Sequence, residues 1–426
     1  MISHPVLSRL AAGGIRLGLE RIESFLEDLG SPHLAFPVLH VAGTNGKGSV
    51  CAMAASMLQA QGLRVGVTTS PHLQAVNERI QVDGVSITDA ELDVLIAEVE
   101  TRACDWAARF GEWEADDGPP LTYFEAVLAA AFLHFQRKAV EVAVVEVGLG
   151  GRLDATSVVS PTVSVITSIG LDHMEQLGPD LASVAAEKCG IMREGVPVVV
   201  GALPAEAALV VRAMGSERGA PQLELGRDFG VSGGHVGFSY ERGAVSREGL
   251  ALGLHGLHQV ENAGVAITAV ELMGERVPQL AVGESALRRG LEQARHPGRL
   301  EWVEDGVLVD GCHNAHAAER LAQYLRGLSR DGSRSLLLGC SREKDVRSIA
   351  AVLAPEVDQI LTTSCAHPRS LEPDALAEAL EGLGCPVRPS GPVEQALPFA
   401  QNQGGIVIAA GSLFLVGAVR DLLAPQ

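Results

Sequence analysis

The chain has 426 residues, 47% of them hydrophobic and 20% charged, which gives ample apolar material for a core and suggests about two or three domains. Its formal net charge of −19 argues against the broad basic surface that non-specific nucleic-acid binding requires. Seven widely spaced cysteines without a CxxC pair, no signal peptide and no apolar run long enough for a membrane span indicate a cytoplasmic protein with reduced thiols.

Strand patterns alternate with helix patterns through the first half of the chain. Apolar runs without polar alternation predict strands buried on both faces of a parallel sheet, at 37–43, 65–70, 140–148, 162–170 and 196–201. Helix patterns lie between these runs, at 47–62, 122–138 and 180–192. This alternation predicts an α/β fold with a mostly parallel, doubly wound sheet.

In the second half of the chain, the strand–helix alternation is interrupted and then resumes as a second α/β series. Gly- and Ser-rich sequence at about 215–255 predicts a small antiparallel β appendage. Pro297-Gly298 follows a helix pattern and marks the predicted boundary between a domain at 1–296 and a smaller Rossmann-like α/β domain at 297–426. The strands of the smaller domain are predicted at GVLVDG, SLLLGC, VDQILTT and GIVIAAGS.

The sequence GTNGKGS, residues 43–49, joins a predicted strand to a predicted helix. A glycine loop at a helix N-terminus presents backbone N–H groups to an anion, and Lys47 can reach terminal phosphates. The loop departs from G-x-x-x-x-G-K-[ST], because Val41 occupies the first glycine position and Gly48 follows the lysine. The alternative is a plain strand–helix turn, but three glycines and a lysine favour phosphate binding.

Polar side chains follow several predicted strands at the edge where ligands bind in open α/β sheets. Ser70, Glu146 and His173, with Asp172 beside it, hold such positions and can converge near the phosphate loop. Serine and carboxylate oxygens suit Mg²⁺, whereas histidine is a less usual ligand. A solvated turn carboxylate for Glu146 and a backbone-bonded helix-start histidine for His173 are the alternatives.

Three further groups have both structural and functional interpretations. Lys188 lies on an apolar helix, where its chemistry alone favours an amine that extends to solvent over a desolvated, reactive one. Thr122 and Glu125 form a capping box beside Tyr123 and Phe124, which offer a stacking surface. In DGCHNAH, residues 310–316, the side chains either face a ligand or cap a helix.

Taken together and in order, these motifs resemble the Mur ligase superfamily, in its folylpolyglutamate synthase/dihydrofolate synthase branch. The resemblance rests on HVAGTNGKGS, TTSPHL with NERI, LTYFE, VEVGLGGRLDAT, ITSIGLDHMEQLG, EKCGI, GLHQVENA, PGRLE, DGCHNAH and GSLFLVG. It implies that the loop is a separate G-T-N-G-K-G-S type rather than a damaged one. It also implies an ATP-dependent amide ligase that phosphorylates a pterin carboxylate and adds L-glutamate to it, acting as a monomer on small molecules.

The resemblance assigns roles residue by residue. It implies ATP contacts at Asn45, Gly46, Lys47, Gly48, Ser49, Asn262, Arg299 and Asp310. It implies two Mg²⁺ ions held by Ser70, Glu146 and His173, and a carbamylated Lys188 that acts in catalysis with Lys47 and His173. It implies pterin contacts at Thr122, Tyr123, Phe124, Glu125, Leu153, Asp154 and Ala155, and glutamate contacts at His313 and Ser412.

The sequence departs from the family pattern at three positions. Cys312 and Ala315 replace the alanine and proline of the usual D-G-A-H-N-P, and Ser157 replaces the asparagine of L-D-A-T-N. None of these changes removes an implied ligand, so they bear on specificity more than on activity. A Mur-type ligase acting on a UDP-sugar peptide and a phosphate-loop NTPase without ligation are the alternative functions.

Overall fold

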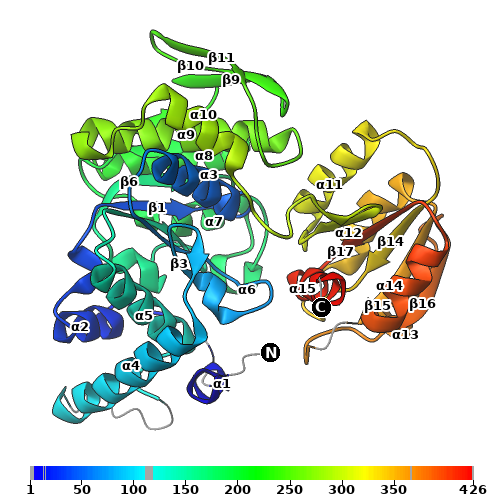
Figure 1. The fold of residues 1–426 in the computed structure, drawn as a ribbon, viewed down its shortest axis with the longest axis horizontal. Helices are drawn as coiled ribbons and strands as arrows, with labels where there is room; N and C mark the ends of the chain where they lie inside the picture. Colours follow the sequence, from blue (N-terminus) through cyan, green and yellow to red (C-terminus); the bar gives the residue numbers. More distant parts are fainter. Residues whose placement is uncertain (1–3, 13, 15, 111–118, 365–366, 425–426) are drawn as a thin grey trace. The chain divides into compact units, whose positions relative to one another are not determined.

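The computed structural model describes residues 4–12, 14, 16–110, 119–364 and 367–424 (Figure 1). They form two compact units. The larger unit contains the chain up to Gly253 together with Val260–Ala294, and the smaller unit contains Leu254–Gln259 together with the chain from Arg295. Within these described ranges, no helix is long and apolar enough to cross a membrane.

A mostly parallel eight-stranded sheet forms the centre of the larger unit. From edge to edge its strands are β4 (Val85–Ser86), β3 (Ile80–Val82), β2 (Val65–Thr68), β5 (Val142–Glu146), β1 (Val38–Ala42), β6 (Pro161–Ile166), β7 (Val198–Val200) and β8 (Gln222–Glu224). Only β3 and β4 run antiparallel to their neighbours. All five residues of β1 and of β5 are buried, as expected for central strands covered on both faces.

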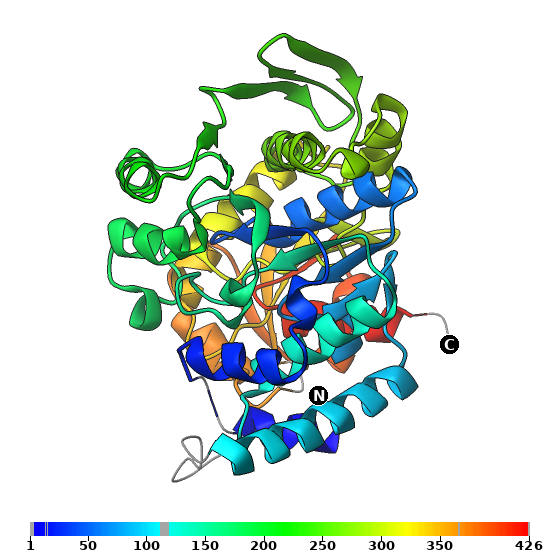
Figure 2. The same cartoon turned by 90° about the vertical axis from the view of Figure 1, so that its left-hand side faces the viewer.

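Helices cover both faces of this sheet (Figures 1 and 2). They are α1 (Pro5–Ala12), α2 (Glu20–Asp28), α3 (Lys47–Ala60), α4 (Asp89–Phe110), α5 (Tyr123–Arg137), α6 (Met174–Leu177), α7 (Leu181–Lys188), α8 (Ala205–Glu217), α9 (His258–Arg276) and α10 (Glu284–Gln293). Short 3₁₀ turns are η1 (Pro32–Leu34), η2 (Val76–Arg79), η3 (Ala155–Val158), η4 (Cys189–Ile191) and η5 (Pro278–Leu280). Helices α3, α9 and α10 lie on one face, and α2, α4 and α5 lie on the other.

The antiparallel appendage covers a shorter stretch of the chain than the predicted range of about 215–255. Its three strands are β9 (Phe229–Gly234), β10 (Gly237–Arg242) and β11 (Val245–Leu250). Residues 215–217 instead complete α8, and 222–224 form the edge strand β8 of the main sheet. The Tyr240 hydroxyl, which donates to Glu271 at 2.8 Å, ties the appendage to α9.

The smaller unit contains a six-stranded sheet. Its strand order is β12 (Glu301–Glu304), β13 (Val307–Asp310), β17 (Ile406–Ala410), β14 (Arg334–Leu338), β15 (Gln359–Ser364) and β16 (Val387–Pro392), with only β12 antiparallel. Its helices are α11 (Ala315–Gly327), α12 (Val346–Leu353), α13 (Pro373–Ala379), α14 (Val393–Asn402) and α15 (Leu413–Leu423), and η6 spans Ala354–Glu356. Apolar residues of α11, α12 and α13 pack with Leu308, Leu336 and Ile408 of the sheet.

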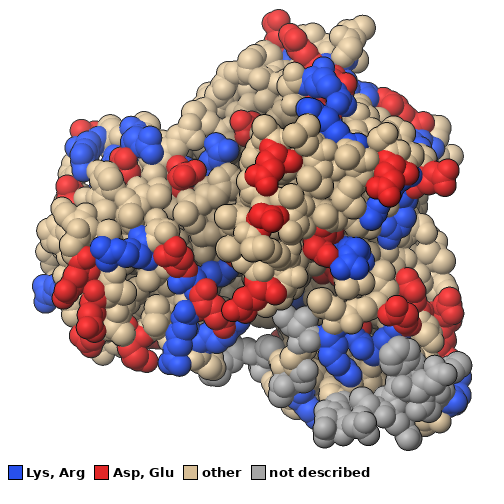
Figure 3. All heavy atoms as spheres, turned by 180° about the vertical axis from the view of Figure 1, so that it is seen from behind, with Lys and Arg blue, Asp and Glu red and all other residues tan. Residues whose placement is uncertain are grey.

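The predicted fold class is confirmed, and one helix end differs from the prediction. Helix α7 ends at Lys188 and tightens into η4 instead of continuing to Met192. The reason is close packing, since a Cβ on Gly190 would lie 2.2 Å from Cα of Arg152. On the face seen in Figure 3, acidic and basic side chains are interspersed.

Candidate active site

The phosphate loop lies between β1 and α3 and depends on two glycines. Gly43 and Gly46 have φ angles of +154° and +83°, which residues other than glycine rarely adopt. A Cβ on Gly43 would lie 1.9 Å from Thr167 Oγ1, and one on Gly46 would lie 2.7 Å from Asn262 Oδ1. Gly46 is the N-cap of α3 and has no side chain to cap the helix, so the loop leads into a helix N-terminus of the kind that binds anions.

The loop after β6 braces the phosphate loop. Thr44 N donates to Ser168 O at 2.8 Å, and Asn45 N lies 3.0 Å from Ser168 Oγ. The Thr167 hydroxyl donates to Asn45 O at 2.7 Å. These bonds fix the peptide orientations of the loop before any ligand binds, which lowers the ordering cost of binding.

Two lysine ammonium groups converge on one carbonyl of the loop. Lys47 Nζ donates to Gly43 O at 3.1 Å, and Lys188 Nζ donates to the same oxygen at 3.0 Å. Lys188 is only 3% exposed, so the interpretation that its amine extends to solvent is wrong. Burial and then the charge of Lys47 lower the pKa of Lys188 to about 7, against the opposing pull of Asp172 and Asp154.

Of the three predicted metal ligands, the structure brings two together. Glu146 ends β5 and accepts a hydrogen bond from Ser70 N at 3.1 Å, next to the cis Ser70-Pro71 peptide. The Ser70 hydroxyl is buried and has no hydrogen-bond partner. A buried hydroxyl left unpaired beside a carboxylate fits a hard cation such as Mg²⁺, which would complete its shell with water and phosphate oxygens.

His173, the third predicted metal ligand, is the N-cap residue of α6. It precedes α6 with φ of +51°, and its side chain is 49% exposed beside Asp172, with 3.9 Å between Nε2 and Oδ1. No group of three or more His, Cys, Asp or Glu side chains suited to a metal occurs in the described ranges.

The predicted pterin contacts differ in how far their side chains are already paired within the protein. Glu125 Oε2 accepts from Thr122 N at 2.7 Å, and Arg21 Nη2 donates to Oε1 at 2.7 Å, so the buried carboxylate is already paired on both oxygens. Phe124 and Asp154 both lie against Gly148, where an added Cβ would be 2.9 Å and 3.1 Å from them. Leu153 is half-buried and Ala155 is buried.

The Arg21–Glu125 pair gives a stability prediction. Replacing Arg21 with methionine leaves the Glu125 charge buried with only its capping bonds, so the free energy of unfolding should fall by about 3–5 kcal/mol. Arg137 lies on the same helix α5 as Glu125, and Arg137→Met, which removes its exposed pair with Glu98 of α4, should cost less than about 1 kcal/mol. Urea unfolding of both variants measures the difference, and equal costs would contradict this account.

Tyr123 has a partner that sequence reasoning missed. The guanidinium of Arg79 lies 5.3 Å from the Tyr123 ring centroid, and its Nε donates to His72 Nδ1 at 2.9 Å. Burial lowers the pKa of Arg79, and the neighbouring Tyr123, Glu146 and Glu78 side chains oppose that shift. The NERI motif contained this arginine, but nothing local in the sequence indicated its burial.

The smaller unit contains four predicted site residues. Asp310 ends β13 and accepts from Leu300 N and Cys312 N, both at 2.9 Å; burial raises its pKa, and Arg299 opposes that rise. His313 Nδ1 lies 3.0 Å from Gly311 O. Ser412 caps α15 by accepting from Phe414 N at 3.2 Å.

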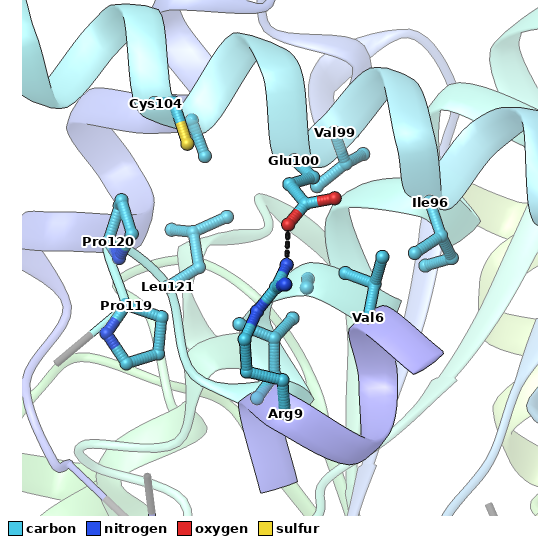
Figure 4. Close-up of a pocket in the computed structure, with 12 residues that line it drawn as sticks. Val6, Arg9, Ile96, Val99, Glu100, Cys104, Pro119, Pro120 and Leu121 are labelled. Carbon is cyan, nitrogen blue, oxygen red and sulfur yellow. Dashed lines mark hydrogen bonds and ion pairs between the residues drawn. The ribbon is translucent and has the colours of Figure 1, made fainter. Parts of the chain in front are cut away.

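A separate pocket of about 420 Å³ lies between α1, α4 and residues 119–121 (Figure 4). Val6 and Ile96 contribute to its apolar wall, and Arg9 pairs with Glu100 across it. It contains none of the predicted site residues.

Known proteins resemble this chain over nearly its whole length. The sequence models of the Mur ligase middle domain and of the Mur ligase glutamate ligase domain match residues 41–270 and 298–413. The chain is 34% identical over 425 residues to dihydrofolate synthase/folylpolyglutamate synthase of Bacillus subtilis, with 96% of each chain covered. It is 35% identical to the probable bifunctional folylpolyglutamate synthase/dihydropteroate synthase of Haloferax volcanii, but spans only 48% of that relative while 95% of this chain is covered.

A solved structure agrees with these relatives. The structure of E. coli FolC in complex with DHPP and ADP matches with a TM-score of 0.87 at 33% identity, covering 98% of this chain and 95% of that one. The fold and the loop thus define an α/β protein with a phosphate loop of the G-T-N-G-K-G-S type. The chain belongs to the Mur ligase family and, within it, to the dihydrofolate synthase/folylpolyglutamate synthases.

Proposed function

We propose that the protein is an ATP-dependent ligase that adds L-glutamate to the carboxylate of dihydropteroate, of a tetrahydrofolate, or of both. The phosphate loop carries the proposal, because Thr167 and Ser168 brace it through Asn45 and the Lys47 amine lies 3.1 Å from Gly43 O within it. The names of the relatives and the DHPP and ADP of the FolC structure support the substrates.

The reaction joins an amine to a carboxylate through a phosphorylated intermediate. A carboxylate oxygen of the pterin substrate attacks the terminal phosphorus of ATP, and the bond from that phosphorus to ADP breaks. The amine of glutamate then attacks the acyl carbon, phosphate leaves with the electron pair of the broken C–O bond, and the new amide loses a proton. Phosphorylation supplies the leaving group that a free carboxylate lacks, and positioning and charge stabilisation supply much of the remaining rate.

The proposed ATP contacts come from several motifs of the sequence. Asn45 to Ser49 would bind phosphate oxygens, with Lys47 on the terminal ones, and Asn262 would lie beside the loop at Gly46. Arg299 and Asp310 of the smaller unit would contact the nucleotide. We assign ATP binding to residues 1–296 and glutamate ligation to 297–426, in keeping with the two matched domains.

Magnesium fits the pair formed by Ser70 and Glu146, and we propose two ions held by these residues and His173. When bound, the metal would neutralise phosphate charge. Lys188 would react with carbon dioxide, so that a nitrogen–carbon bond forms and a proton leaves. The resulting carbamate would present oxygens where the structure holds an amine.

The acceptor and glutamate would bind on different units. Thr122, Tyr123, Phe124 and Leu153 to Ala155 would line the pterin side, with Phe124 as the half-buried stacking surface. Glu125 would act mainly through its capping and arginine bonds. His313 and Ser412 would lie near the incoming glutamate.

A product assay tests the function. Purified protein with Mg-ATP, glutamate and either dihydropteroate or a tetrahydrofolate should form the glutamylated pterin, resolved by mass, together with ADP. Transfer only to a UDP-sugar peptide would favour the cell-wall branch. ATP hydrolysis that ignores both pterin and glutamate would contradict ligation.

The protein is further proposed to act as a cytoplasmic monomer. The six cysteines within the described ranges, at 51, 104, 189, 312, 340 and 385, are free thiols, which suits a reducing compartment. Cys365 lies outside the described residues. Sedimentation of the purified protein tests the oligomeric state.

A further inference from the structure

A buried hydrogen-bonded chain links the strand of the phosphate loop to the predicted pterin loop. His40 lies in β1, fully buried, with Nε2 3.0 Å from Thr156 Oγ1. Thr156 is 1% exposed, and its Oγ1 atom also lies 2.5 Å from Asp154 Oδ1. No step proposed so far uses His40 or Thr156.

The direction of the hydrogen bonds follows from the donors available. Thr156 has one hydroxyl hydrogen, and the Asp154 carboxylate can only accept it when ionised. Thr156 Oγ1 must then accept from His40, which places the imidazole hydrogen on Nε2. His40 Nδ1 is left as a buried lone pair without a partner, and burial, then Arg193, lowers the pKa of His40 to about 3, so the ring is neutral.

Asp154, the last residue of this hydrogen-bonded chain, lies beside the proposed stacking surface. Asp154 Oδ1 receives both the hydroxyl and, at 3.0 Å, the backbone N–H of Thr156, whereas Oδ2 accepts from Leu149 N at 2.7 Å. Oδ2 is the oxygen that approaches Gly148, against which the Phe124 ring also packs. Both carboxylate oxygens are thus hydrogen-bonded, Oδ1 twice and Oδ2 once, and Oδ2 lies on the side of the half-buried aromatic ring.

We propose that His40 and Thr156 are positioning residues that fix the Asp154 carboxylate for recognition of the N–H groups of the pterin ring. This inference rests on the proposed function, because it takes a pterin as the ligand beside Phe124. Without the Thr156 hydroxyl, Asp154 loses one charge-assisted hydrogen bond and is then held by the backbone N–H groups of Thr156 and Leu149, so a planar donor ligand would meet a less firmly oriented acceptor. The phosphate loop keeps its own bracing by Thr167 and Ser168.

Paired variants separate positioning from packing. Thr156→Val keeps the shape and removes the hydroxyl, whereas Thr156→Ser keeps the hydroxyl. His40→Leu removes the donor, whereas His40→Gln retains an N–H at similar reach. We expect Thr156→Val and His40→Leu to raise KM for the pterin roughly tenfold, the effect of losing one hydrogen bond to a charged group, with KM for ATP and kcat within about twofold. The serine and glutamine variants should recover most of the loss.

Pterin fluorescence titration without ATP or glutamate gives a second readout besides turnover. A pterin-selective loss of affinity that the conservative variants rescue supports the inference. Equal losses for pterin and ATP, or no difference between Thr156→Val and Thr156→Ser, would overturn it while leaving ligation by the native protein intact. Native protein that binds no pterin would overturn both proposals. If Thr156→Val fails to fold, the His40→Gln and His40→Leu pair decides by the same comparison.

Discussion

Lys188→Met is expected to lower the rate of glutamate ligation roughly a hundred- to a thousand-fold, the range for removing one preorganised electrostatic group. The reason is placement, since the Lys188 amine lies 3.0 Å from Gly43 O at the base of the phosphate loop. Ligation assays with saturating ATP measure the loss. Lys138→Met, which removes an exposed lysine paired with Glu91, is the matched control and should retain activity.

The pKa of Lys188 determines whether it can be carbamylated. Only the neutral amine reacts with carbon dioxide, and with a pKa of about 7 about half of the amine is neutral at pH 7. Activity of protein freed of bicarbonate should therefore recover on adding bicarbonate, and the recovery should weaken as pH falls below 7. Near-normal turnover of Lys188→Met, or no response to bicarbonate, would exclude the carbamate.

The same pKa makes a stability prediction with a definite sign. The folded protein holds Lys188 with a pKa of about 7, against 10.5 when the chain is unfolded, so the unfolded chain binds more protons between these values. Below pH 7, where Lys188 is charged in both states, burial of its ammonium should thus lower the unfolding free energy of the native protein by its full amount. It should rise with pH from about 7 to 10.5, and Lys188→Met should lack this part of the rise in urea titrations.

The sequence predicted local features of the site better than its long-range contacts. The phosphate loop and Glu146 were predicted because apolar runs locate strands and the polar residues follow them directly. The burial of Lys188 was missed by residue-level reasoning, since its partner Gly43 is 145 residues away. The Arg21–Glu125 pair likewise joins residues 104 apart, and no local pattern indicates such a pairing.

Local sequence patterns also did not predict the residues at which helices end. Helix α7 stops at Lys188 because the backbone of Arg152 packs against Gly190, a contact between the GLGGRLDAT and EKCGI motifs. Arg152 N also donates to Glu187 O at 2.9 Å. Both motifs were recognised, but their contact exists only in the folded chain.

Glu146→Gln is expected to raise the magnesium concentration needed for half-maximal ligation at least about tenfold, with a fall in the maximal rate. Glutamine keeps the side-chain size and an oxygen that can accept from Ser70 N, so the fold should persist, but it removes the charge that holds a divalent cation. Magnesium titrations of ligation measure the shift. Glu141→Gln is the matched control, because Glu141 directly precedes the same strand and accepts a hydrogen bond from Arg64 N.

A double variant decides whether Ser70 and Glu146 bind one ion. If the unpaired Ser70 hydroxyl and the Glu146 carboxylate share a cation, Ser70→Ala should also raise the magnesium requirement, and the double variant should lose less than the two single losses combined. Independent roles would give additive effects. Metal-free ADP binding, measured by calorimetry, should change little in all three variants, because the loop is braced by Thr167 and Ser168 rather than by Glu146. An unchanged magnesium requirement in Glu146→Gln would remove this pair from the metal site.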